Sequence, residues 1–298
     1  MSTSMSTLLI DAGNTRIKFA VCASTAAPGA VHLSQALWQG ACDTHASAEQ
    51  LVCALQQCPL YVGANMSPDT QLPRVLRAVG VCVAGEVVRQ RIQAALMPLS
   101  VLWLSGATPL PGLRNHYATP HTLGADRWLA AYGLMHAAQP VAPLQGRAQR
   151  TLPGNTQAAV LATFGTATTV DVLVWDSASG EAVFEGGIIC AGLHSAWRSV
   201  SRSTAQLPDV GFGAEPVTPP SAMPAIPNNT HAALTLGAIY AQVGAVAQVL
   251  ERVRPQHGEP SLWVSGGVLP QLAAYLPPAR MIETPALLGL LHALAVLK

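Results

Sequence analysis

Residues 8–21 change between apolar and polar character in a way that predicts a β-hairpin. The run 8–10 (LLI) is typical of a short buried strand, and it ends at Asp11. Residues 12–15 (AGNT) are turn formers, and in 16–21 (RIKFAV) every second residue is a large apolar one. The pattern therefore predicts a strand, a tight turn and a returning half-buried strand, and not a strand that feeds a helix.

A second stretch repeats this design in the other half of the chain. Residues 158–175 (AAVLATFGTATTVDVLVW) form an apolar strand, a turn centred on Gly165 and Thr166, and a strand that alternates again. Gly13 and Gly165 are 152 residues apart (165 − 13). Two similar units at about half the chain length predict an internal duplication.

The rest of the pattern predicts an α/β fold, because apolar runs of strand and helix length are separated by turn residues. In the first half we expect strands at 60–62 and 101–104, helices before and after Pro68, a loop over 110–120, an amphipathic helix over 122–138 with Thr122 as its N-cap, and a surface loop over 139–157. In the second half we expect a glycine bulge within 185–192, a helix over 193–207, a Pro-rich loop over 211–230, a long apolar helix over 231–254, a strand–turn–helix over 261–275 and a last helix over 287–297.

Length and composition limit the class of protein. A chain of 298 residues predicts two domains, which we place at 1–120 and 121–298. Half of the residues are hydrophobic and 10% are charged, which favours a large core and self-association. A net charge of +1 without a basic run argues against a nucleic-acid partner.

The sequence contains no recognisable targeting signal and no recognisable cysteine pair. The first residues (MSTSMSTLLIDAG) lack a basic segment followed by a long apolar one, and no run of about 18 uninterrupted apolar residues occurs, so we expect neither a signal peptide nor a membrane span. The six cysteines form no Cys-x-x-Cys pair and have no zinc-ligand spacing. We expect reduced thiols in a cytoplasmic protein.

The turn of the first hairpin carries candidate chemistry. It lacks both the Gly-rich turn into a helix of a dinucleotide site and the Gly-Lys-Ser/Thr of a P-loop. Backbone N–H groups and the hydroxyl at Gly13, Asn14 and Thr15 could instead face a phosphate, while Asp11 holds a hydrated Mg²⁺ and Lys18 supplies a point charge. An ordinary hairpin with a polar turn is the other interpretation.

The predicted helix 122–138 begins with an acidic residue beside a loop. Asp126 in the first turn stabilises the helix dipole, or it accepts a proton from a substrate hydroxyl while Arg127 binds an anionic group. Tyr117, in the preceding loop, either covers the edge of the core or contacts a ligand. The residues alone leave both interpretations open.

Taken together, the motifs closely resemble those of type III pantothenate kinases. They are, in order, DAGNTRIK (11–18), GADR (124–127), GTATTVD (165–171), GG (186–187), TAQLP (204–208) and GG (266–267). The resemblance covers nearly the whole chain.

The resemblance implies a duplicated fold of two RNase H-like domains of the actin and sugar kinase type, facing across a cleft and usually forming a homodimer. It implies ATP-dependent phosphorylation of the primary hydroxyl of pantothenate, which opens coenzyme A biosynthesis. Asp126 would be the general base, and the pantothenate site would also contain Tyr117, Gly124, Ala125, Arg127 and Thr204. ATP phosphates and Mg²⁺ would be held by Asp11, Ala12, Gly13, Asn14, Thr15, Arg16, Ile17 and Lys18, with Asp11 as the metal ligand and Thr166 as a nucleotide contact of the second domain.

Two positions depart from the family pattern. Many relatives have Asp two residues before the glycine of the second turn, where it helps to bind a monovalent cation such as K⁺ or NH₄⁺; here the residue is Thr163, whose neutral hydroxyl cannot replace a carboxylate charge. Cys190-Ala191 stands where relatives commonly have proline before the next glycine. A nucleotide-binding regulatory protein of the same fold, or a kinase of another small molecule, is the alternative function.

Overall fold

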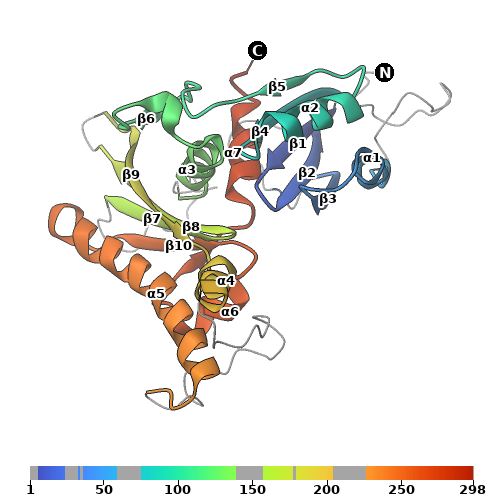
Figure 1. Ribbon diagram of the computed structural model, residues 1–298. Helices are drawn as coiled ribbons and strands as arrows, with labels where there is room; N and C mark the ends of the chain where they lie inside the picture. Colours follow the sequence, from blue (N-terminus) through green and yellow to red (C-terminus); the bar gives the residue numbers. More distant parts are fainter. Residues whose placement is uncertain are drawn as a thin grey trace. The chain divides into compact units, whose positions relative to one another are not determined.

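The computed structural model describes residues 6–23, 33, 36–58, 75–138, 157–176, 179–203 and 226–297. The chain forms two compact units (Figure 1). Unit 1 contains residues 1–138 and 284–298, and unit 2 contains residues 139–283. Unit 2 is therefore an insertion between two parts of unit 1.

Unit 1 contains a five-stranded mixed sheet in the order β3-β2-β1-β4-β5. Its strands are β1 (Ser6–Ala12), β2 (Arg16–Ala23), β3 (Trp38–Asp43), β4 (Val75–Cys82) and β5 (Val101–Trp103). β2 is antiparallel to both of its neighbours, β1 and β3, whereas β4 is parallel to β1 and β5 is parallel to β4. In this unit β6 (Leu113–Asn115) is a short strand within the predicted loop 110–120.

Helices cover both faces of this sheet because the side chains of β1 are apolar in both directions. Ile10 packs with residues of α1 (Ala48–Gln56) and α2 (Glu86–Ala95) in one buried cluster. Leu9 points to the opposite face, where α3 (Ala125–Ala138) contacts β4 and α7 (Pro285–Ala293) contacts β1 and β2. Burial on both faces explains why β1 reads as a continuous apolar run.

Helices α3 and α7 pack so closely that glycine is needed on both. A Cβ atom added to Gly133 of α3 would lie 2.2 Å from the carbonyl oxygen of Pro285, and one added to Gly289 of α7 would lie 1.9 Å from that of Leu129. The packing buries α3 on nearly all sides, so the expected amphipathic helix is wrong in that respect.

Unit 2 repeats the sheet of unit 1. Its strands β7 (Ala158–Phe164), β8 (Ala167–Trp175), β9 (Ala182–Ala191), β10 (Ser261–Ser265) and β11 (Arg280–Met281) lie in the order β9-β8-β7-β10-β11. β7, β8 and β9 are antiparallel, and β10 and β11 continue in parallel from β7. Order and direction match those of unit 1 strand for strand, which confirms the duplicated RNase H-like architecture.

One face of this sheet packs on helices. α5 (Thr230–His257) contacts β7 and β8, and it also contacts α4 (Leu193–Ser203). The short helix α6 (Leu269–Leu272) contributes to the same core. Among the described residues, α5 is long and apolar enough to cross a membrane by length and composition, with 39% of its most apolar 18-residue window buried. One such helix is weak evidence, since the core helix of a soluble protein has the same properties.

Several predicted boundaries differ from the observed ones. The compact units do not divide at 120/121, because α3 and residues 284–298 belong to unit 1. Thr122 is not an N-cap: it lies in a 3-10 turn (Pro120–Thr122), and the first hydrogen bond of α3 runs from the Trp128 N–H to the Gly124 carbonyl. The predicted strand 60–62, and most or all of the loops 139–157 and 211–230, lie outside the described residues.

Other predictions are confirmed. Both hairpins form, and β9 carries a bulge at the double glycine, where the register against β8 shifts and Gly186 has a φ of 126°. The structure pairs none of the six cysteines, all of which lie in the described ranges, and the reduced state of the thiols stays a prediction.

Candidate functional site

Residues 13–15 form the turn of the first hairpin, which we call the first tip. One hydrogen bond crosses this turn, and Thr44 donates two more to it. The Gly13 N–H donates to the Arg16 carbonyl at 3.0 Å across the turn. Thr44, directly after β3, donates its hydroxyl to the Gly13 carbonyl at 2.6 Å and its N–H to the Thr15 carbonyl at 2.9 Å. Asn14, Thr15 and Arg16 are exposed, as the contacts of a soluble ligand must be.

Asp11 is the second-last residue of β1, just before the first tip. Its side chain is only 13% exposed, and its Oδ2 lies 3.8 Å from the Nζ of Lys18. Burial raises the pKa of Asp11 to about 6, Lys18 opposes this rise, and the charge of Asp126 adds to it. The contribution of Asp126, which lies 115 residues later in the chain (126 − 11), is the smallest of the three.

Asp126 lies in the first turn of α3 and is held in one orientation. Its Oδ1 accepts the backbone N–H of Arg127 at 2.8 Å. A Cβ atom at Gly124 would lie 2.6 Å from this Oδ1, so glycine leaves the room that the carboxylate occupies. Burial raises the pKa of Asp126, and the hydrogen bond and positive charge of Arg127 partly oppose the rise.

Arg127 and Tyr117 form a pair beside Asp126. Arg127 is buried, and its Nη1 donates to the Tyr117 hydroxyl at 3.1 Å. The guanidinium also lies over the Tyr117 ring, 5.8 Å from its centroid. The start of α3 is fixed by Trp128, whose ring N–H donates to the Thr108 carbonyl at 2.8 Å.

The second hairpin has its own tip, residues 165–166, in unit 2; we call it the second tip. The Gly165 N–H donates to the Ala167 carbonyl at 3.1 Å, as Gly13 does to Arg16. Thr166 is exposed, and its carbonyl accepts the Gly192 N–H at 3.1 Å and the Ser195 hydroxyl at 2.9 Å. Thr204, the other predicted residue of this unit, lies outside the described residues.

Unit 1 therefore gathers most of the predicted site residues. Asp11 to Lys18 form one loop and its strand ends, and residues 124–127 with Tyr117 form a second group in the same unit. Sequence reasoning missed Thr44, whose partners are 29 and 31 residues earlier in the chain. The only local signal was a turn-forming Asp-Thr pair after an alternating strand.

The donor set suits a cation that binds through few protein ligands. Within the described ranges no three side chains of the His, Cys, Asp and Glu types gather at a metal-binding distance. Mg²⁺ commonly binds one or two carboxylates and completes its shell with water and phosphate oxygens. Asp11, a poorly solvated carboxylate beside an exposed turn, fits that requirement.

Comparisons with known sequences identify a family. The sequence model of type III pantothenate kinase matches residues 7–252. The type III pantothenate kinase of Cupriavidus taiwanensis is 34% identical over 304 residues, covering 97% of both chains, and that of Herminiimonas arsenicoxydans is 30% identical over 299 residues with the same coverage.

A solved structure supports the fold alone. The structure of a conserved putative Baf family transcriptional activator from Campylobacter jejuni superposes on this chain with a TM-score of 0.53 at 16% identity. The superposition includes 97% of this chain and 98% of the other. The extent of the family match and the full-length relatives establish that this chain belongs to the type III pantothenate kinase family.

Proposed function

We propose that this protein transfers the γ-phosphoryl group of ATP to the primary hydroxyl of pantothenate, forming 4′-phosphopantothenate in the first step of coenzyme A biosynthesis. The family supports this reaction. The observation that carries the residue roles is the pair of poorly solvated carboxylates in unit 1, Asp11 just before the first tip and Asp126 at the start of α3.

Asp126 is the general base of the proposal. The alcohol loses its proton as the new P–O bond forms, and a carboxylate fixed at a helix start can take up that proton. Burial raises the pKa of Asp126, which makes it a better proton acceptor than an exposed carboxylate. The Arg127 N–H fixes one of its oxygens and leaves the other for the substrate hydroxyl.

Arg127 and Tyr117 supply the contact for the pantothenate carboxylate. A buried guanidinium has lost part of its hydration and gains from a carboxylate partner more than an exposed one does. Tyr117 fixes the direction of the guanidinium by a hydrogen bond and by its ring. Gly124 and Ala125 provide backbone beside the base, and Thr204 stays a proposed contact from the family motif.

The first tip and Asp11 hold the phosphates. The exposed residues 14–16 offer backbone N–H groups and side-chain donors, Ala12, Gly13 and Ile17 provide the backbone frame, and Lys18 neutralises oxygen charge. Asp11 would hold Mg²⁺, which when bound supplies charge neutralisation to the transferred phosphoryl group. Thr166 of the second tip is the proposed nucleotide contact of unit 2.

The proposal also covers the cellular location, the partners and the monovalent cation site of the protein. We place the protein in the cytoplasm, without a nucleic-acid or membrane partner, and we expect no K⁺ or NH₄⁺ site because Thr163 replaces the Asp of many relatives.

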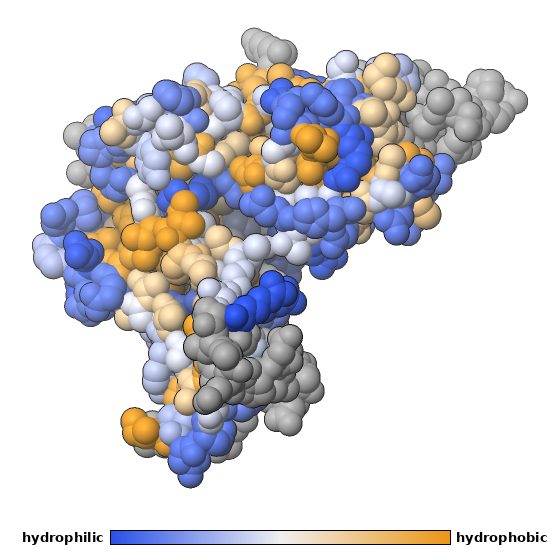
Figure 2. All heavy atoms as spheres, in the orientation of Figure 1, coloured by the Kyte–Doolittle hydropathy of each residue, from blue (hydrophilic) through white to orange (hydrophobic). Residues whose placement is uncertain are grey.

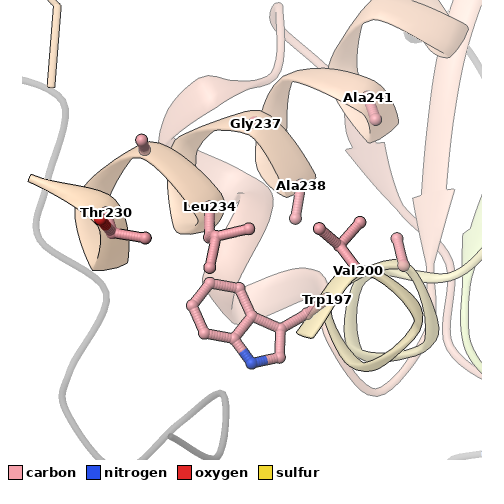
Figure 3. Close-up of a pocket in the computed structure, with 9 residues that line it drawn as sticks. Trp197, Val200, Thr230, Leu234, Gly237, Ala238 and Ala241 are labelled. Atoms are coloured by element: carbon pink, nitrogen blue, oxygen red, sulfur yellow. The ribbon is translucent and has the colours of Figure 1, made fainter. Parts of the chain in front are cut away.

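A homodimer is supported by apolar exposure on unit 2. An apolar pocket of about 420 Å³ lies between α4 and α5, lined by Trp197, Val200 and Leu234 among others (Figure 3). Ile188 and Ile189 of β9 are 40% and 61% exposed, and Figure 2 shows apolar surface over the position of that strand. Light scattering on the purified protein tests the dimer, and a monomer at micromolar concentration would contradict it.

Pantothenate-dependent release of ADP from Mg-ATP tests the function. We expect turnover with pantothenate and little without it; equal rates would favour a nucleotide-binding protein without this kinase activity. Asp126→Asn keeps the shape of the side chain and removes the base, so kcat should fall about 10²- to 10⁴-fold with the fold unchanged. Glu86→Gln, which removes an exposed carboxylate of α2 in the same unit, is the control and should leave kcat within about twofold.

A further inference from the structure

Thr44 is a buried polar residue that donates two hydrogen bonds to the first tip. It directly follows β3, its side chain is 1% exposed, and its hydroxyl and N–H donate to the carbonyls of Gly13 and Thr15. A buried hydroxyl is costly unless it is bonded, and here the bond goes to the backbone of a loop that is itself exposed. The contact therefore joins the loop to the sheet.

Fixing these two carbonyls also fixes two amides. In a trans peptide unit the C=O and the following N–H point in opposite directions and lie in one plane. Because the Gly13 carbonyl points to Thr44, the Asn14 N–H points away from it. In the described part of the chain no carbonyl accepts the Asn14 N–H, which leaves this amide available to a phosphate oxygen.

Thr44 is itself held from a second element. The Nη2 of Arg91, on α2, donates to the Thr44 carbonyl. Arg91 therefore fixes Thr44 from α2 by this hydrogen bond, and Thr44 in turn fixes the first tip. The connection runs from α2 through the turn after β3 to the first tip, and neither Arg91 nor Thr44 belongs to the family motifs.

Unit 2 repeats the N–H contact but not the hydroxyl contact. There the residue after β9, Gly192, donates its N–H to the carbonyl of Thr166, as Thr44 does to the carbonyl of Thr15. The Ser195 hydroxyl donates to the same Thr166 oxygen, whereas the Thr44 hydroxyl donates to the other carbonyl of its tip, that of Gly13. In each copy of the fold the residue after the third strand therefore binds the tip through its N–H, and in unit 1 the Thr44 hydroxyl adds a second fixed carbonyl.

We propose that Thr44 is a positioning residue for the nucleotide phosphates: its hydroxyl orients the backbone of the first tip so that the Asn14 amide faces the phosphate. Thr44 does not touch the substrate itself. The inference rests on the proposed function, since the tip must bind ATP for its orientation to matter.

Thr44→Val tests the hydroxyl, because valine has nearly the same shape and keeps the N–H bond to Thr15. We expect the KM for ATP to rise about three- to tenfold, the range for one lost hydrogen bond, with the KM for pantothenate within twofold of wild type. Thr44→Ser, which keeps the hydroxyl, should restore the KM for ATP. Thr7→Val, which removes another buried hydroxyl at the far end of β1, is the matched control and should leave it unchanged.

Hydrogen exchange of a peptide covering residues 11–18, without nucleotide, gives a second readout that does not depend on activity. Thr44→Val should speed exchange there and Thr7→Val should not. If the wild type has no pantothenate-dependent turnover, the proposed function fails, and titration of the variants with Mg-ATP still measures the effect on the tip. An unchanged ATP affinity in Thr44→Val, an equal rise in the pantothenate KM, or a serine variant that behaves like valine would overturn the role of Thr44.

Discussion

Asp11→Asn should make the protein more stable at neutral pH while it abolishes the proposed activity. The carboxylate of Asp11 is 13% exposed, and the effect of burial outweighs the opposing charge of Lys18, so its ionised form is poorly solvated when no cation is present. Asparagine has the same shape and no charge, and it resembles the protonated acid. The variant therefore lacks the free-energy cost of burying an ionised carboxylate, which the wild type has at its proposed metal site.

The size of the effect follows from the pKa. Burial raises the pKa of Asp11 from 3.8 to about 6 in the folded protein. A difference of about 2 units corresponds to about 3 kcal/mol at 1.36 kcal/mol per unit, as an upper bound. For a unit of this size, that amounts to roughly 6–12 °C in Tm.

The size of the stability gain depends on pH. Between pH 4 and pH 6 the folded protein keeps the proton that the unfolded chain has released, so the free energy of unfolding of the wild type decreases as pH rises. The variant lacks this dependence. Its advantage over the wild type should be under about 1 kcal/mol at pH 4 and should reach its maximum by pH 7.

Thermal unfolding at pH 4, 5, 6 and 7 without Mg²⁺, with hydrogen exchange of β1 to follow unit 1 separately, measures this difference. Glu86→Gln is the control, since it removes a carboxylate of α2 that is 63% exposed and pairs only at the surface with Arg89. A variant that is no more stable than the wild type at pH 7, or whose gain is the same at pH 4, would refute the reasoning.

Three further outcomes follow from contacts described above. Gly124→Ala should lower kcat about 10- to 100-fold with Tm nearly unchanged, because the added Cβ would lie 2.6 Å from Oδ1 of Asp126 and must displace it; steady-state kinetics with a melting curve check this. Gly289→Val should destabilise the protein by about 3 kcal/mol or more in urea, because a Cβ there would lie 1.9 Å from a carbonyl oxygen of α3, whereas Gly244→Val, with open space around it, should cost under about 1 kcal/mol. Replacing K⁺ by Na⁺ should change the rate less than twofold, since Thr163 brings no charge; a strict K⁺ requirement would contradict this.

The sequence predicts the parts of this fold that depend on neighbours in the chain. Both hairpins follow from alternation and from turn residues between the strands, and Asp126 is placed at a helix start by the residues around it. The bulge of β9 follows from its double glycine, because Gly186 adopts a φ of 126° that other residues rarely adopt.

Contacts between distant residues could not be predicted in this way. Thr44 reaches Gly13 only because β3 pairs with β2 in a register that places Asp43 opposite Arg16. The pattern of residues 38–43 does not specify that register, since this strand is half-exposed. Thr122 looked like a cap, but the 3-10 turn that starts at Pro120 delays the start of α3.

Helix α7 has a consequence for how the chain is made. Residues 139–283 separate it from α3, the helix on which it packs through Gly133 and Gly289. During synthesis from the N-terminus, the whole of unit 2 leaves the ribosome before residues 284–293 can cover the second face of the first sheet. A nascent chain that pauses in this interval exposes the apolar surface of β1 and α3, so unit 1 should depend on chaperones until translation passes α7.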